Sequence, residues 1–119
     1  MTYRLSINNE EKFVRFDLSG KLTESEIDSA IADLQRIREK QKLNCVLCNQ
    51  YDLEVPPNDL VGFFTAKRLS SGSFVGIKLA IVRSDTTKER LFEIAASNRG
   101  AIVKVFDDEE KAIHWLHNN

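Results

Sequence analysis

The stretch from Ile77 to Leu116 constrains the fold of this chain more than any other part. It holds two apolar runs, GIKLAIV and AIVKVF, joined through RSDTTKERLFEIAASNRG and followed by DDEEKAIHWLHNN. Continuous apolar runs of this length are typical of strands covered on both faces. Thr86 and Glu89 have capping-box spacing, which predicts that a helix starts there, between the two apolar runs, and ends near Gly100. Because strands joined through a helix pack as parallel neighbours with a right-handed crossover, this stretch indicates an α/β fold.

The chain before this stretch supplies a hairpin and a first helix. Apolar and polar residues alternate over 3–7 and again over 13–18, with a turn-prone polar segment between them, which predicts an antiparallel hairpin. Thr23 and Glu26 have capping-box spacing, and apolar residues then recur at helical intervals as far as Lys42. We therefore expect a hairpin followed by an amphipathic helix.

The remaining elements complete a single domain. A third strand is expected over 43–48 and a second helix over 58–69, after two prolines that cannot continue a central strand. Asp107 and Glu110 repeat the capping pattern and start the last helix. The order ββαβαβαβα predicts one α/β domain over residues 1–119, with a mixed, mostly parallel five-stranded sheet and four helices.

Composition narrows the class of protein. The chain has 119 residues, of which 42% are hydrophobic and 29% charged, with a formal net charge of −1. A net charge this close to zero gives no strong electrostatic field that would attract nucleic acid or anionic lipid. No segment has the order of a signal peptide, and no apolar run approaches the ~20 residues that span a bilayer. The two cysteines fit a reducing compartment, so we expect a cytoplasmic protein without membrane insertion.

Cysteine and histidine spacings suggest chemistry that their context does not support. Cys45 and Cys48 form a C-x-x-C inside a predicted strand, where residues three apart point to opposite faces, so both are expected to be small buried hydrophobes. His114 and His117 lie one helical turn apart and could share a metal ion. The alternative, a solvated helix end, fits the lack of zinc-site spacings better. We predict no catalytic residue, no metal and no cofactor.

The ends of the predicted strands carry the polar residues most relevant to binding. In open α/β sheets, ligands bind beyond the carboxyl ends of the strands. Tyr51 and Asp52 follow one strand there, and Arg83 and Ser84 follow the next. Arg83 and Ser84 at a helix start could hold an anion, or they could simply cap the helix.

Aromatic residues mark a second candidate surface. Phe63 and Phe64 lie on the expected helix 58–69, and Phe74 lies just beyond the short SSGS segment. One core-facing stripe cannot comfortably bury all of these rings together with the other apolar residues of the helix. The surplus could enter the core, line a pocket or contact a partner chain.

Longer segments of the chain resemble a known family. The segments FDLSGKLT, KLAIV and NRGAIVKVFDDEEKAIHWL, in this order after a hairpin, are similar to the SpoIIAA-like branch of the STAS-domain superfamily. The resemblance implies a small STAS-like domain with a regulatory or ligand-sensing role, in a family that is not generally enzymatic. The family's phosphorylated members carry an Asp-Ser-x-Gly motif after the third strand. Here residues 49–54 read NQYDLE, so no phosphorylation site is carried over.

Two functions remain open on these grounds. The first is a non-enzymatic regulatory domain that binds a protein partner or forms a homodimer. The second is a carrier or sensor of a small apolar or anionic ligand, held near Arg83 and the helix 58–69. An enzyme ranks third, because no nucleophile elbow or phosphate-binding loop is present.

Overall fold

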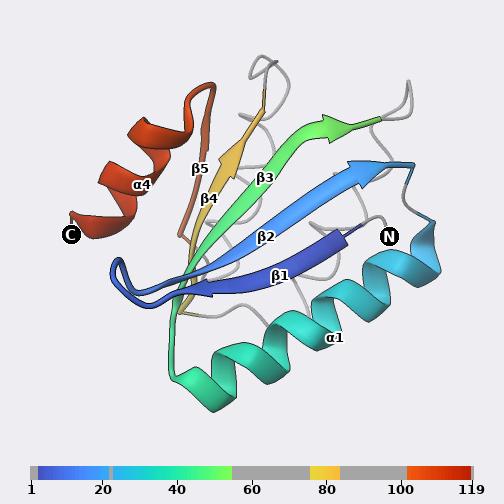
Figure 1. Ribbon diagram of the computed structural model, residues 1–119, viewed down its shortest axis with the longest axis horizontal. Coiled ribbons are helices and arrows are strands. Elements are labelled where there is room, and N and C mark those ends of the chain that lie inside the picture. Colours follow the sequence, from blue (N-terminus) through green and yellow to red (C-terminus); the bar gives the residue numbers. More distant parts are fainter. Residues whose placement is uncertain (1–2, 22, 55–75, 84–101, 119) are drawn as a thin grey trace.

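Five strands form one sheet in the computed structural model, which describes residues 3–21, 23–54, 76–83 and 102–118. The strands are β1 (Tyr3–Asn8), β2 (Phe13–Gly20), β3 (Cys45–Leu53), β4 (Lys78–Val82) and β5 (Ile102–Phe106). They lie side by side in the order β1-β2-β3-β4-β5 (Figure 1). β1 pairs with β2 antiparallel, and every other neighbouring pair is parallel. The predicted mixed, mostly parallel sheet is confirmed.

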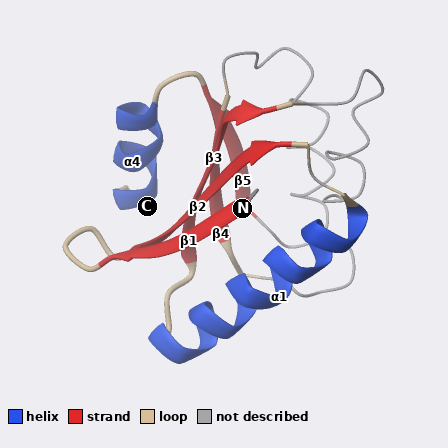
Figure 2. Cartoon of the chain, turned by 45° about the vertical axis from the view of Figure 1, so that its right-hand side comes forward, coloured by secondary structure: helices blue, strands red, loops and turns tan. Residues whose placement is uncertain are grey.

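Two helices belong to the described part of the chain, α1 (Glu24–Gln41) and α4 (Glu109–His117). They pack on opposite faces of the sheet (Figure 2). The two other predicted helices, over 58–69 and between the last two strands, lie outside the described residues. Neither α1 nor α4 combines the length and the apolar character that crossing a bilayer requires.

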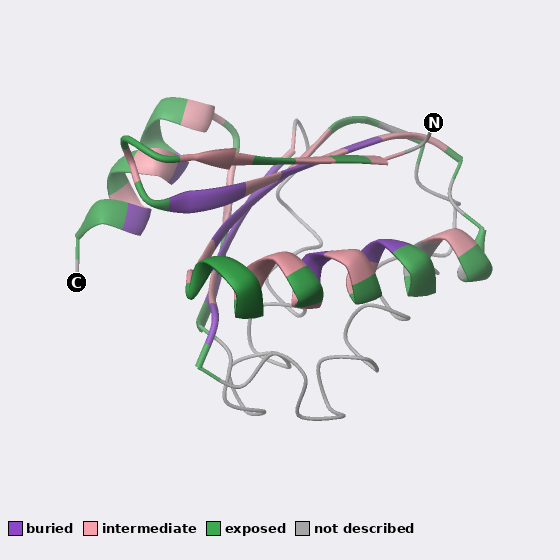
Figure 3. Cartoon of the chain, turned by 60° about the horizontal axis from the view of Figure 1, so that its bottom comes forward, coloured by how far each residue is buried: buried purple, intermediate pink, exposed green. Residues whose placement is uncertain are grey.

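α1 begins and ends as its sequence predicts. The Thr23 side chain accepts a hydrogen bond from the Glu26 backbone N–H, and the Glu26 side chain accepts one from the Thr23 N–H. This capping box satisfies two donors that a helix start leaves free. Lys42 ends the helix with a φ of 55°, the left-handed conformation that closes many helices. Ala30 and Leu34 turn towards the sheet and are buried, while the outer face is exposed (Figure 3).

Strand alternation divides the apolar side chains into two cores. The core under α1 takes alternate residues of the strands, Ile77 just before β4, and the helix residues Ala30 and Leu34; its strand members are Val14, Phe16, Leu18, Val46, Cys48, Leu79, Ile81 and Val103. The core under α4 takes the intervening strand residues Phe13, Leu47, Ala80 and Val82. Two residues of the helix itself, Ala112 and Leu116, complete it. The central strands are therefore buried from both sides, as their continuous apolar runs predict.

α4 begins one residue later than predicted. We expected Asp107 to cap this helix, but the N-cap is Asp108, whose carboxylate accepts the Glu110 N–H at 2.8 Å. The docking of the helix is as predicted, since Ala112 and Leu116 are buried against β3 and β4. Trp115 is only half-buried, with its ring 5.6 Å from that of Phe106.

Candidate functional site

The carboxyl ends of the parallel strands meet at one edge of the sheet, beside the start of α4 (Figure 1). Asn49 pairs with Val82, and Val82 pairs with Phe106, so the polar residues that follow them are neighbours. This is the edge at which open α/β sheets bind ligands. The structure thus brings the ends of β3, β4 and β5 together as the sequence predicts.

β3 is longer than predicted and carries a bulge at this edge. We expected the strand to end at Cys48, but it continues to Leu53, because β2 extends beside it and the Glu54 N–H donates to the Gly20 carbonyl at 2.8 Å. The register shifts along the way: Asp17 pairs with Asn49, but Ser19 pairs with Asp52, so β3 has one extra residue. A bulge bends its strand and redirects side chains, and bulges are common beside functional sites.

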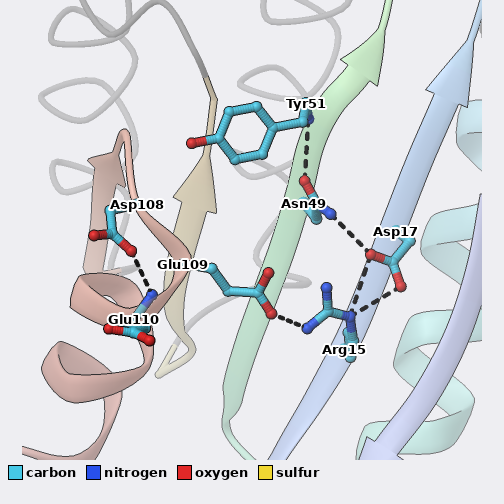
Figure 4. A network of polar contacts seen from close by, with 7 residues as sticks. All are labelled: Arg15, Asp17, Asn49, Tyr51, Asp108, Glu109 and Glu110. Carbon is cyan, nitrogen blue, oxygen red and sulfur yellow. Dashed lines mark hydrogen bonds and ion pairs between the residues drawn. The ribbon is translucent and has the colours of Figure 1, made fainter.

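A polar network connects β2, β3 and α4 on the α4 side of the sheet (Figure 4). Arg15 forms ion pairs with Asp17, at 3.1 Å from its Nε, and with Glu109 of α4. The Asn49 amide donates to Asp17 at 3.1 Å, and the Asn49 carbonyl oxygen accepts the Tyr51 N–H at 3.1 Å. We call these five residues the carboxyl-end network. Its ion pair between Arg15 and Glu109 joins the start of α4 to β2.

Arg15 is the one cation among these five residues, and it pairs with both carboxylates, Asp17 and Glu109. The hydrogen bond to Glu109 is the main cause that raises the pKa of Arg15, against the opposing effect of burial, and Asp17 raises it further. The guanidinium is therefore permanently charged, and it holds two carboxylates at once. Asp17 on β2 and Glu109 on α4 are thus joined through the same cation.

Tyr51 is the exposed member of the network. Its side chain is directed towards the start of α4 (Figure 4), where its hydroxyl donates to the backbone carbonyl of Asp107. The residue is nevertheless 44% exposed, one of two large hydrophobic residues in the described chain that are exposed to this degree. The residue is thus held by its backbone N–H, which donates to Asn49, and by its side-chain hydroxyl, which donates to Asp107.

Arg83 lies on the other face of the sheet. Its N–H donates to the Phe106 carbonyl at 2.9 Å, and its guanidinium reaches the Gln50 side chain at 3.5 Å. Its charge also acts on the Cys48 thiol, which belongs to the core under α1. The sequence grouped Tyr51 and Arg83 at one edge, and the structure separates them onto the two faces.

The other predicted binding residues have mixed outcomes. Asp52 is exposed and helps to line an open hollow of about 800 Å³ beside β1, β2 and α1. The described lining of this hollow includes apolar and charged side chains: Tyr3, Arg4, Leu5, Asp17, Leu18, Ser19, Asp33, Arg36, Ile37, Asn49 and Asp52. Ser84, Phe63, Phe64 and Phe74 lie outside the described residues.

Sequence reasoning missed Arg15, Asp17 and Glu109 as site residues. Arg15 and Asp17 carry a usable signal, because opposite charges two apart on a strand point to the same face. Glu109 carries none, since it lies 94 residues from Arg15 and only the folded chain brings them together.

The two cysteines occupy opposite faces of β3, as predicted. Cys45 packs with the core under α4, and Cys48 belongs to the core under α1. Burial raises the pKa of the Cys48 thiol to about 12. A thiol this far from ionisation is a poor nucleophile at neutral pH.

The two histidines interact with different neighbours near the end of α4. His117 lies 3.5 Å from the Glu11 carboxylate in the hairpin loop, and His114 lies 3.0 Å from the Asn118 amide. Over the described ranges, no three His, Cys, Asp or Glu side chains gather in a way that could hold a metal ion.

Comparison with solved structures finds the same fold over nearly the whole chain. An uncharacterized protein of the DUF3478 family with a SpoIIAA-like fold, from Shewanella loihica PV-4, has a TM-score of 0.65 at 18% identity, covering 96% of this chain and 91% of that one. The anti-sigma factor antagonist SpoIIAA in its unphosphorylated form has a TM-score of 0.65 at 16% identity, covering 98% and 99%. The Bacillus cell fate determinant SpoIIAA in its phosphorylated form has a TM-score of 0.60 at 16% identity, covering 96% and 98%.

These comparisons establish the fold. No protein-family model matches the sequence, and no curated protein matches it. The SpoIIAA-like fold that the sequence resemblance implied is confirmed by all three structures.

Proposed function

We propose that this chain is a non-enzymatic regulatory domain that binds a protein partner or a second copy of itself. The observation that carries the proposal is Tyr51, an exposed aromatic residue anchored by hydrogen bonds on a polar network at the carboxyl edge of the sheet. The fold agrees with this role, because SpoIIAA, a solved protein that matches over 99% of its own length, is named as an anti-sigma factor antagonist. That name describes a protein that acts on another protein.

The arrangement around Tyr51 favours recognition over catalysis. Tyrosine is enriched among the residues that dominate binding energy, since its ring covers a large area and has few rotatable bonds. Here the ring is ordered before any partner arrives, so binding loses little side-chain entropy. The charged groups beside it, Arg15 and Glu109, already have partners and form a polar rim of the kind that surrounds interface anchors.

Photo-cross-linking from position 51 tests this proposal. The photoreactive residue p-benzoylphenylalanine would replace Tyr51 in the protein made in its native cell, and separately replace Lys40, which is exposed on α1. A discrete adduct from position 51 alone, reduced by competition with unlabelled wild-type chain but not with Tyr51→Ala, supports the proposal. The same adducts from both positions, or none from position 51, contradicts it.

A second candidate, a carrier or sensor of a small ligand, is favoured by the open hollow of about 800 Å³. Its lining mixes the apolar Leu5 and Ile37 with charged side chains of both signs, the cations Arg4 and Arg36 and the carboxylates Asp17, Asp33 and Asp52, which suits a small ligand with an apolar part and a polar part. Native mass spectrometry of the freshly purified protein decides between the two functions. A retained small mass that is lost in an Arg36→Glu variant favours the carrier.

Three further expectations complete the proposal. Phe63, Phe64 and Phe74 remain predicted contact residues for the partner or ligand. Ser84 remains a predicted anion contact beside Arg83. A cytoplasmic location, without a cofactor, remains the prediction from composition.

A further inference from the structure

β1 is the open edge of the sheet. It lies at the end of the strand order and, within the described chain, pairs only with β2. An unpaired edge presents a row of backbone N–H and C=O groups to solvent, which is a template for another strand. The register between β1 and β2 is continuous from Tyr3 to Asn8, so no bulge twists this edge away.

The sequence of β1 contains few of the residues that usually protect an edge strand. The strand reads YRLSIN, with no proline and no lysine, and its only charge is Arg4. Natural edge strands are commonly blunted by lysine, proline, a bulge or an inward-pointing charge. β5, at the opposite end of the sheet, has Lys104 at its centre. An edge without such protection is suited to pairing.

The apolar side chains of β1 continue the core under α1 out to this edge. Tyr3 and Leu5 pack against that core but are only half-buried, and the Tyr3 ring stacks on Phe16 at 6.2 Å. Ile7 lies on the same face and is also half-buried. A strand added beside β1 would cover apolar surface as well as backbone groups.

From this edge we infer that β1 pairs antiparallel with β1 of a second copy, joining two sheets into one. The inference rests on the proposed function and specifies its self-associating form. Antiparallel pairing of identical strands is twofold symmetric, so it closes at a dimer instead of extending to a fibre. Both α1 helices then lie on one side of the joined sheet and both α4 helices on the other.

The sequence of β1 is complementary to itself in this arrangement. Paired residues must share a face, so a pairing centred on Leu5 brings Tyr3 opposite Ile7 and Leu5 opposite Leu5, and one centred on Ser6 brings Leu5 opposite Ile7. If the pairing is centred on Leu5, Arg4 lies opposite Ser6 of the second copy. If it is centred on Ser6, Arg4 lies opposite Asn8. Neither register places like charges directly opposite each other, which would be destabilising.

Ser6 provides the test, because it is exposed and on the face away from the α1 core. In Ser6→Lys the new lysine lies opposite Arg4 of the second copy in one register and opposite the second copy's new lysine in the other, in addition to Arg15 of its own copy in both, so both registers gain opposed like charges across the dimer. We expect dimerisation to weaken about tenfold. Ser6→Glu separates the registers: it strengthens the dimer if Leu5 is central and weakens it if Ser6 is central.

The measurement is sedimentation equilibrium of the full chain over a range of concentrations, with a thermal melt of each variant. Ser29→Lys, the same change on the exposed face of α1, is the matched control and should leave the dimer unchanged. A wild-type chain that stays monomeric, a dimer that Ser6→Lys leaves intact, or assembly beyond the dimer overturns the inference. None of these outcomes affects cross-linking from Tyr51, so failure here and failure of the partner-binding proposal are distinguishable.

Discussion

Arg15 links two elements that are distant in sequence, and this link sets what the network can do. Its guanidinium holds Asp17 on its own strand and Glu109 at the start of α4. Acidic residues are favoured in the first turn of a helix, so Glu109 also interacts well with the helix dipole. The ion pair therefore positions α4, and with it the Asp107 carbonyl that anchors Tyr51.

A double-mutant cycle on Arg15 and Glu109 measures the strength of this link. With Arg15→Gln and Glu109→Gln, singly and together, we expect a coupling of about 0.5–1 kcal/mol, because both side chains are partly exposed to solvent. The same cycle on Asp107 and Lys111, a pair that is about two-thirds exposed on both sides, serves as control and should give a value near zero. Equal coupling for the two pairs would mean that the network is an ordinary surface cluster.

Cys48 makes stability depend on pH in the alkaline range. Its pKa is raised from 9.0 to about 12, so above pH 9 the unfolded chain releases this proton before the folded chain does. The folded state binds more protons there, and the free energy of unfolding falls as the pH rises from about 9 to about 12, by up to about 1.4 kcal/mol per pH unit. Below pH 9 the contribution is constant.

Urea titrations at several alkaline pH values check this dependence. Other groups also titrate there, so the informative quantity is the difference between the wild-type chain and Cys48→Ala, in which this slope should be absent. Parallel pH profiles for the two proteins would show that the thiol is less buried than its 7% exposure indicates.

α4 illustrates which features of an element sequence can predict. The apolar spacing of Ala112 and Leu116 predicts the buried face of the helix, because residues four apart lie on the same side. The same spacing cannot decide whether Trp115, at the margin of that face, is covered. Its ring is half-buried, and Lys78 lies over it at 4.7 Å while donating to the Trp115 carbonyl at 2.6 Å.

Alanine substitutions in α4 should reflect this difference in burial. We expect Leu116→Ala to lower the free energy of unfolding by about 3 kcal/mol, since it leaves a cavity under the helix. Trp115→Ala should cost about 2 kcal/mol, below the 3–5 kcal/mol typical of a fully buried ring. Chemical denaturation of both variants gives the comparison, and a larger loss for Trp115→Ala would reverse this assignment.

β3 illustrates what sequence cannot predict. Asn49 and Asp52 are of residue types depleted in strands, and polar residues predominate between them, so the sequence alone indicates a loop. They are nevertheless in β3, because β2 runs beside them as far as Gly20 and pairs with their backbone. The bulge arises from the same pairing. Because the strand runs further than predicted, the sequence could not predict on which face of the sheet Tyr51 lies. It also could not predict that Arg83 lies on the other face.

At the scale of the whole molecule, the fold was more predictable than the site. Apolar runs, capping boxes and the hairpin alternation each report local structure, and together they allow few topologies. The site depends on contacts between distant segments, such as Arg15 with Glu109 and Tyr51 with Asp107. No local pattern reports these contacts, so the sequence predicted the edge of the sheet but not the network on it.

The two cores share the central strands, and this makes the unfolding of the domain cooperative. β2, β3 and β4 each contribute side chains to both faces, so loss of α4 or α1 exposes strands that the other core needs. We therefore expect one unfolding transition. If β1 also pairs with a second copy, folding and dimerisation are linked, and the melting temperature must rise with protein concentration.

Thermal melts at increasing concentration test this linkage. For a two-state dimer of this size, each tenfold increase in concentration should raise the melting temperature by about 3 °C. Leu116→Ala should lower the melting temperature at every concentration and leave this dependence unchanged, because it acts inside each copy. Ser6→Lys should reduce the dependence itself, because it acts between copies. A melting temperature that does not depend on concentration in the wild-type chain would mean that β1 remains unpaired in solution.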